Sequence, residues 1–250
     1  KKIFLNKNAL VKLTIGNELS NKNKIYLYPH FDLMSCKINT KIEVGFNGLK
    51  FKVKKKDYKL KNLIVRVVEP GYLESNKGVH INQIIKLRPL TKKDEYAIKT
   101  AIKNNVKYFA ISFVNKSSDI DKVRKLVNNK AFIISKIETK AAMSELKSIA
   151  KKSNALLIDR GDLSKDISIE EIPLAQERII KIGKSEKVPV YVATNLLETM
   201  IKENQPTRAE SQDIFSTLKQ GASGLVLAAE TAIGVNPVGC VKFLKRSIRV

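Results

Sequence analysis

The sequence predicts an α/β protein in two parts, a small antiparallel β domain over residues 1–77 and a parallel β/α portion over residues 78–250. Two observations predict this division. Before Gly78, short β-branched and aromatic runs are separated by turn residues, and no long helical pattern interrupts them. After Gly78, apolar runs alternate with helical patterns, which is typical of a parallel sheet, either open or rolled into a barrel.

The first part is expected to consist of strands joined by turns. Residues 10–15, 24–28, 51–53 and 60–68 carry β-branched or aromatic side chains, several of them in alternation. The strongest hairpin signal is Asn47-Gly48, which separates two strand-like runs. This dipeptide favours the left-handed backbone of a tight two-residue turn, so we expect antiparallel pairing across it.

We expect five parallel strands in the second part, with helices in the gaps between them. The predicted strands cover residues 106–114, 131–137, 155–159, 188–193 and 224–228. The predicted helices cover residues 91–103, 117–128, 140–152, 171–186, 208–219 and 237–248. Thr207 is a candidate N-cap for the fifth of these helices.

Charge and cysteine content narrow the class of protein. Lys and Arg number 47 against 24 Asp and Glu, a formal net charge of +23. Because the lysines are spread over every segment, a solvated surface explains them better than a nucleic-acid interface does. Cys36 and Cys240 lack metal-ligand spacing and are expected to be reduced thiols. With no apolar run near the about 20 residues of a membrane span, we expect a soluble, cytoplasmic protein.

Charged side chains follow two neighbouring predicted strands. Lys136 and Glu138 lie on the same side of one strand by period-two geometry, and Asp162 follows the next strand. Because the carboxyl ends of parallel strands meet at one edge, the two carboxylates are a suitable pair for Mg²⁺. Lys136 would then neutralise charge on a moving phosphoryl group. A buried salt bridge of Lys136 with either acid explains the pattern equally well.

Two further positions point to the same edge. Gly161 would let a small anion approach the backbone closely, although this signal alone is weak. Thr194 ends the next strand and offers a hydroxyl to the same cavity, or else serves as an ordinary helix N-cap.

Taken together, these segments resemble the pyruvate kinase family. The matching motifs, in that family's order and near its spacing, are Ile133-Ile-Ser-Lys-Ile-Glu138, Arg160-Gly-Asp-Leu163, Leu174-Ala-Gln176, Val192-Ala-Thr194, Glu198-Thr-Met-Ile-Lys202, Pro206-Thr-Arg-Ala-Glu210 and Glu230-Thr231. Weaker matches extend the similarity to essentially residues 71–237. The resemblance implies a TIM-type β/α barrel, incomplete at its N-terminal side in this chain, with residues 1–77 as a small antiparallel β lid domain.

The resemblance also implies roles for single residues. Lys136 matches the lysine that stabilises the transferring phosphoryl group of phosphoenolpyruvate, and Glu138 and Asp162 match the ligands of the divalent metal, Mg²⁺. The backbone N–H groups of Gly161 and Asp162 would bind the substrate carboxylate. Thr194 matches the threonine beside the enolate carbon that becomes the pyruvate methyl group.

The implied activity is a glycolytic phosphotransfer from phosphoenolpyruvate to ADP, giving pyruvate and ATP. Lys77 lies where the family has a nucleotide-side lysine, and the lid would close over the site and exclude water. A homo-oligomer is the expected assembly. Two alternatives stay open. One is a divergent relative that uses phosphoenolpyruvate or a 2-oxoacid in other chemistry, and the other is a catalytically silent ligand-binding or regulatory domain.

The sequence also departs from the family pattern. Asn115 stands where a basic residue is usual, Asp159 replaces a small residue before Arg160, and Ser164 replaces a glycine. An extra carboxylate near a metal site would alter its charge, unless Asp159 points outward between strand and helix. The first barrel strands of the family, which carry a substrate-phosphate arginine and the ligands of K⁺, do not occur in this sequence, nor does the C-terminal regulatory domain. We therefore expect a fragment of a longer chain, a partner that supplies the remainder, or a divergent relative.

Overall fold

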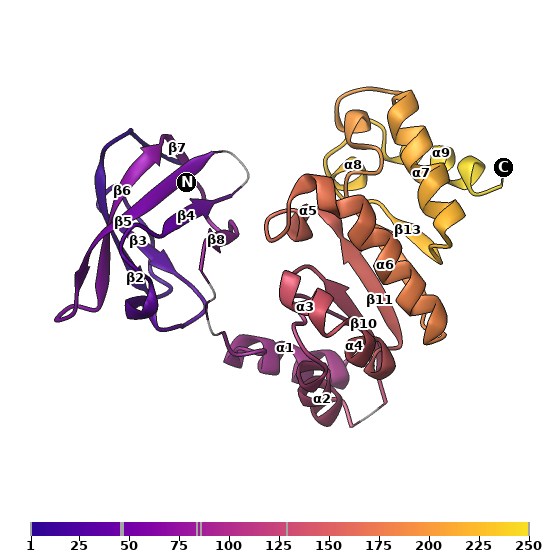
Figure 1. The fold of residues 1–250 in the computed structure, drawn as a ribbon, viewed down its shortest axis with the longest axis horizontal. Coiled ribbons are helices and arrows are strands. Elements are labelled where there is room, and N and C mark those ends of the chain that lie inside the picture. The colour runs from indigo at the N-terminus through magenta and orange to yellow at the C-terminus, as the bar shows by residue number, and fades with distance from the viewer. Residues whose placement is uncertain (1, 46–47, 84, 86, 129, 250) are drawn as a thin grey trace. The chain divides into compact units, whose positions relative to one another are not determined.

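The chain divides into two compact units, each with its own secondary structure (Figure 1). The computed structural model describes residues 2–45, 48–83, 85, 87–128 and 130–249. The first unit spans Lys1–Thr91 and the second Lys92–Val250. The predicted boundary after residue 77 is earlier than this division, because strand β8 (Val79–Ile81) pairs antiparallel with β4 (Lys41–Val44) of the first unit.

The first unit is built from β-strands. Its six-stranded sheet has the order β3-β2-β6-β5-β4-β8, and β1 pairs with β7 in a separate two-stranded sheet. The remaining bounds are β1 (Ile3–Leu5), β2 (Leu10–Ile15), β3 (Lys24–Leu27), β5 (Leu49–Asp57), β6 (Asn62–Glu69) and β7 (Gly71–Leu73), with a short 3-10 helix, η1 (Leu33–Ser35).

Most strand pairs of this unit are antiparallel, as the turn chemistry predicts. Val44 pairs with Leu49 across the predicted hairpin, where Gly48 has a φ of 82° and Asn47 lies outside the described residues. The exception is β2, which pairs parallel to β3 with Leu13 opposite Ile25. Alternating side chains from the strands fill the hydrophobic core of this unit, which includes Leu13 and Ile25.

The second unit is the α/β part that the alternating pattern predicts. Its five strands are all parallel, in the order β13-β12-β11-β10-β9, and form a curled half-barrel, an incomplete β/α barrel. The strands are β9 (Tyr108–Ile111), β10 (Phe132–Ile137), β11 (Ala155–Asp159), β12 (Val190–Ala193) and β13 (Gly224–Val226). The helices are α1 (Lys92–Lys103), α2 (Ser117–Leu126), α3 (Lys140–Ser144), α4 (Leu146–Lys152), α5 (Arg160–Leu163), α6 (Ile172–Ser185), α7 (Arg208–Gln220), α8 (Ala229–Ala232) and α9 (Pro237–Ser247), with 3-10 turns η2 (Ile169–Glu171) and η3 (Glu198–Ile201).

The sheet register determines which side chains share a face. Ile158 of β11 is fully buried, and helix α6 packs beside β11 and β12 (Figure 1). Leu157 and Asp159 project to the opposite face of β11. Lys136 of β10 pairs with Leu157, so it projects to the same face as Asp159. The register therefore brings Lys136 and Asp159 together at the carboxyl ends of neighbouring strands.

Among the helices of the described ranges, none combines the length and apolar character of a membrane span.

Candidate active site

The ammonium group of Lys136 joins two carboxylates at the carboxyl end of the sheet. Its Nζ lies 2.6 Å from Glu138 Oε1 and 3.0 Å from Asp159 Oδ2. Burial alone would lower the pKa of Lys136, but the hydrogen bonds to Glu138 and then to Asp159 outweigh it, so this pKa is raised. The side chain is therefore held as a cation, and the salt bridge considered from the sequence is present.

Glu138 is the most enclosed member of this cluster. The residue is 1% exposed, and its Oε2 accepts a hydrogen bond of 2.5 Å from the backbone N–H of Phe113. Phe113 has a left-handed φ of 53° there, in the turn after β9. Burial raises the pKa of Glu138, against the opposing effects of Lys136 and the Phe113 N–H. Its Oε1 contacts the Lys136 ammonium, and no other donor of the described residues reaches it.

Asp159 ends β11 and points into the site, not outward between strand and helix. Besides the Lys136 contact, its Oδ1 accepts from the Asp162 N–H at 3.4 Å and lies 3.5 Å from Thr194 Oγ1. The sequence singled out Asp159 as a departure, and the structure shows that its charge is added to the predicted metal carboxylates.

The Gly161 and Asp162 segment turns directly from β11 into α5, a short helix that periodicity did not predict. The Gly161 N–H donates to Thr194 Oγ1 at 2.9 Å. Burial raises the pKa of Asp162, and the neighbouring Asp159 raises it further. The two N–H groups predicted to bind substrate thus donate to Thr194 and Asp159 in this structure. A substrate carboxylate would have to replace these two acceptors.

Thr194 is not a helix N-cap, so that alternative from the sequence is wrong. It follows β12 with a φ of 71°, which is a strained value for a β-branched residue. Arg160 holds this turn, because its guanidinium donates to the carbonyl oxygen of Thr194 at 2.7 and 3.1 Å and to that of Asn195 at 3.0 Å. The same guanidinium pairs with Asp213 of α7 at 2.8 and 3.0 Å.

A divalent cation fits the donor set of this cluster. Glu138, Asp159 and Asp162 each offer a carboxylate oxygen, and the three oxygens lie within 4.8 Å of one another. Hard oxygen donors of this kind suit Mg²⁺ or Mn²⁺ rather than softer metals. The buried Glu138 Oε1 has Lys136 as its one partner among the described residues, and its second lone pair is available to a cation.

The other positions that the sequence singled out have hydrogen-bond or ion-pair partners of their own. Lys77 belongs to the first unit, where its ammonium pairs with Glu74 at 3.2 Å, and its nucleotide role stays a prediction. The Asn115 side chain accepts from the Thr139 hydroxyl at 2.6 Å, and the Ser164 hydroxyl donates to the Gly161 carbonyl at 2.8 Å. Both substituted residues therefore serve local structure beside the site.

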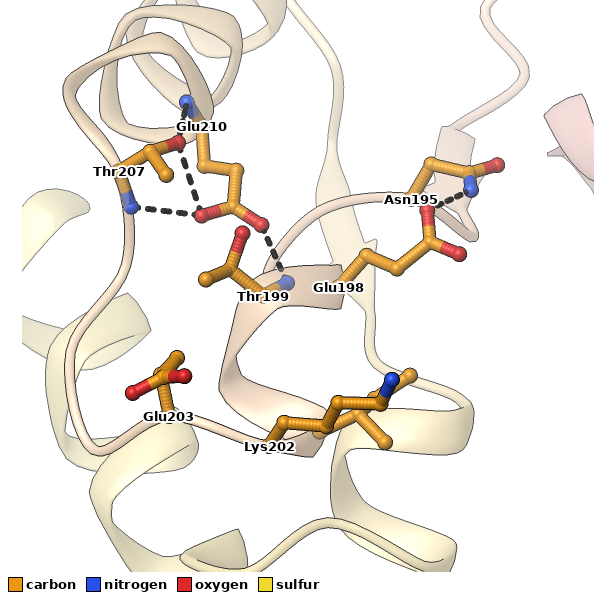
Figure 2. Close-up of a pocket in the computed structure, with 8 residues that line it drawn as sticks. Asn195, Glu198, Thr199, Lys202, Glu203, Thr207 and Glu210 are labelled. Atoms are coloured by element: carbon orange, nitrogen blue, oxygen red, sulfur yellow. Dashed lines mark hydrogen bonds between the residues drawn. The ribbon is translucent and has the colours of Figure 1, made fainter.

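A hollow beside Thr194 offers little to a ligand. Figure 2 shows Glu210 between Thr207 and the Thr199 N–H, with Asn195 and Glu198 bonded to each other. Most of the polar groups that line it are thus engaged with one another. The full lining consists of Asn195, Glu198, Thr199, Ile201, Lys202, Glu203, Thr207 and Glu210, none of which belongs to the carboxylate cluster.

Comparison with known proteins gives a consistent result. A family model described as the pyruvate kinase barrel domain matches residues 1–241. A pyruvate kinase of Thermotoga maritima is 39% identical over 180 residues, which are 70% of this chain and 39% of the relative. A pyruvate kinase of Thermoplasma acidophilum is 33% identical over 239 residues, which are 94% of this chain and 43% of the relative. The chain therefore spans about two fifths of the length of these curated relatives.

Proposed function

The chain belongs to the pyruvate kinase family, and from this premise we propose that its protein transfers a phosphoryl group from phosphoenolpyruvate to ADP, giving pyruvate and ATP. The observation that carries the proposal is the cluster of Lys136, Glu138 and Asp162 at the carboxyl ends of β10 and β11. Enzymes with parallel β/α architecture carry out their chemistry at this edge.

The transfer breaks the bond between phosphorus and the enol oxygen and forms a bond from phosphorus to a terminal oxygen of ADP. Lys136 is suited to neutralise the charge on the moving phosphoryl group, because its ammonium is held charged at the strand end. The enolate that remains takes up a proton at its methylene carbon and becomes pyruvate. We assign Thr194, which stands at the end of the neighbouring strand β12, to the side of that carbon.

Glu138 and Asp162 are the proposed ligands of Mg²⁺. When bound, the cation would polarise the phosphate and carboxylate oxygens of the substrate. The N–H groups of Gly161 and Asp162 would orient the substrate carboxylate, which would replace their present acceptors on Thr194 and Asp159. The β unit is the proposed lid that excludes water, and Lys77 is its proposed contact with the nucleotide. A homo-oligomer is proposed from the family, and K⁺ only for a protein that also carries the earlier barrel strands.

One observation favours the divergent alternative. Asp159 lies 3.0 Å from the Lys136 ammonium, so its carboxylate competes with a phosphoryl group for this ammonium group. A weakened phosphoryl site would suit a relative that uses phosphoenolpyruvate or a 2-oxoacid in chemistry other than transfer to ADP.

The decisive experiment is to incubate the protein with phosphoenolpyruvate, Mg²⁺ and ADP and to measure ATP and pyruvate separately. Equal amounts of both products support the kinase. Pyruvate without ATP supports the divergent enzyme, and binding of phosphoenolpyruvate without either product supports a silent binding domain.

Lys136→Met tests the catalytic assignment. We expect phosphoryl transfer to fall by at least about a hundredfold, because one preorganised charge at a transition state is worth that much. The matched control is Lys147→Met, which removes an exposed lysine paired with Glu186 at 3.6 Å. Turnover of Lys136→Met at the wild-type rate would remove Lys136 from the mechanism.

A further inference from the structure

We propose that Asp159 is a third carboxylate ligand of the divalent cation, so that this chain binds the metal without substrate phosphate. The inference rests on the proposed function for the location of the metal, and it concerns a residue that replaces a small side chain of the family pattern. The two metal carboxylates that the resemblance assigns, Glu138 and Asp162, are thereby joined by one that it does not.

The backbone fixes Asp159 toward the cluster. Asp159 pairs with Ala193 in the register of β11 and β12, and it shares its face of β11 with Leu157, the partner of Lys136. Its side chain is only 12% exposed. At this enclosed strand end, one oxygen of Asp159 lies within 4.8 Å of the ligand oxygens of Glu138 and Asp162.

Two of the carboxylate oxygens have unused capacity to bind a cation. Among the described residues, Asp159 Oδ1 has only long contacts, 3.4 Å to the Asp162 N–H and 3.5 Å to Thr194 Oγ1. Glu138 Oε1 is buried and has the Lys136 ammonium, at 2.6 Å, as its one partner in the described part of the chain, which leaves a lone pair for a cation. Asp159 Oδ1 is thus an enclosed acceptor without a well-formed hydrogen bond, which carries a desolvation cost that a bound cation would relieve.

The charge of the cluster also matches a divalent ion. Three carboxylates and the ammonium of Lys136 leave two negative charges uncompensated within the cluster. With a neutral side chain in place of Asp159, only one would remain. Mg²⁺ sites with one or two carboxylates ordinarily rely on substrate phosphate to complete them. A third carboxylate supplies that charge from the protein, so the metal site exists before the substrate arrives.

The test is a titration of the whole protein with Mn²⁺ alone, without phosphoenolpyruvate or ADP. Free Mn²⁺ is followed by electron paramagnetic resonance, and Mg²⁺ is added to displace it. Asp159→Asn keeps the shape of the side chain and an oxygen that accepts from Lys136, but it removes the charge. We expect the dissociation constant for Mn²⁺ to rise by about tenfold or more, as for other losses from a metal site.

The matched control is Asp121→Asn, which removes one exposed carboxylate that pairs with Lys152. It should leave the dissociation constant unchanged. Circular dichroism without metal checks that both variants are folded, and Asp159→Ala replaces Asp159→Asn if the latter does not fold. Equal affinity of the wild-type protein and the Asp159 variant would overturn the proposal and leave Asp159 as a counter-ion of Lys136.

Failure of this inference is distinguishable from failure of the proposed function. Tight Mn²⁺ binding that depends on Asp159, in a protein that makes no ATP, would remove the kinase and keep the metal ligand. ATP formation together with Mn²⁺ affinity that is insensitive to Asp159 would keep the kinase and remove the ligand.

Discussion

A substitution at Gly161 should affect substrate binding while leaving the stability of the fold nearly unchanged. A Cβ at this position would meet Asp159 Oδ1 and Thr194 Oγ1 at 3.6 Å, which is ordinary van der Waals contact. We therefore expect Gly161→Ala to change the free energy of unfolding by less than about 1 kcal/mol, since alanine also favours the helix α5. The added methyl group would stand beside the N–H groups proposed for the substrate carboxylate, so affinity for phosphoenolpyruvate should fall.

Thermal unfolding and calorimetric titration with phosphoenolpyruvate measure the two effects of Gly161→Ala. Gly234→Ala is the contrasting variant, because its Cβ would lie 2.2 Å from the backbone oxygen of Glu230. It should destabilise the fold by about 1–3 kcal/mol. A loss of stability in Gly161→Ala as large as that in Gly234→Ala would show that Gly161 serves the fold instead.

The cluster could be predicted from single residues only in part. Lys136, Glu138 and Asp162 were recognisable because charged residues after apolar runs fall at strand ends. The direction of Asp159 was not recognisable. Alternation pairs it with Leu157 on one face of β11, but only the register with β10 shows that Lys136 shares this face. Register depends on contacts between segments, which no single strand specifies.

At the scale of elements, Arg160 ties the end of β12 to the helix α7. Its guanidinium bonds two backbone carbonyls and Asp213, and its side chain is 10% exposed. We expect Arg160→Met to lower the free energy of unfolding by about 2–4 kcal/mol. The reason is that the carbonyl oxygens of Thr194 and Asn195 and the carboxylate of Asp213 would lose their hydrogen-bond donor. Urea unfolding measures the loss. Arg124→Met removes a partly exposed arginine bonded to the Lys152 carbonyl and the Asn154 side chain. It should cost less, and equal costs would contradict the interpretation.

Glu210 makes the start of α7 sensitive to acid. Its carboxylate accepts 2.7 Å hydrogen bonds from the N–H groups of Thr199 and Thr207. Burial by itself would raise the pKa of Glu210, but these bonds outweigh it and hold the pKa below the ordinary 4.5. A lowered pKa in the folded state means that the stabilisation is complete above pH 4.5 and is lost as the pH falls through the lowered value.

Glu210→Gln tests this pH dependence. The variant should be less stable than the wild type at pH 7, and the difference should shrink as the pH falls below about 4.5. Urea unfolding at several pH values gives the comparison. Glu203→Gln is the control, because its side chain stands apart from these bonds in Figure 2. A difference between the wild type and Glu210→Gln that is constant down to pH 3 would contradict the assigned role.

The elements themselves were predictable where local pattern determines them. The predicted strand 155–159 matches β11, and Thr207 is the N-cap of α7 as expected. The structure adds that Thr207 forms a capping box with Glu210. The predicted helix 140–152 is divided at Glu145 into α3 and α4, and the predicted strand 106–114 shortens to β9. The parallel pairing of β2 with β3 and the short helix α5 depend on tertiary contacts, which periodicity does not contain.

At the scale of the whole molecule, the net positive charge attracts anions over a distance that shortens as the salt concentration rises. The formal charge of +23 attracts anionic molecules such as phosphoenolpyruvate and ADP. At physiological ionic strength this attraction is screened beyond about 8 Å. Net charge therefore favours encounter with phosphorylated molecules in general, whereas we assign selection among them to the proposed site around Lys136.

The two units predict unfolding in two steps. Each has its own buried core. Leu63 is fully buried in the first unit, and Ile158 is fully buried in the second. Replacing either by alanine should destabilise its own unit by about 2–5 kcal/mol through lost burial and the cavity left behind. In differential scanning calorimetry of the whole chain, Leu63→Ala should lower one transition and Ile158→Ala the other. A single transition that both variants lower equally would mean that the β unit and the half-barrel unfold as one cooperative body, in which case a lid that moves separately from the site would lose its physical basis.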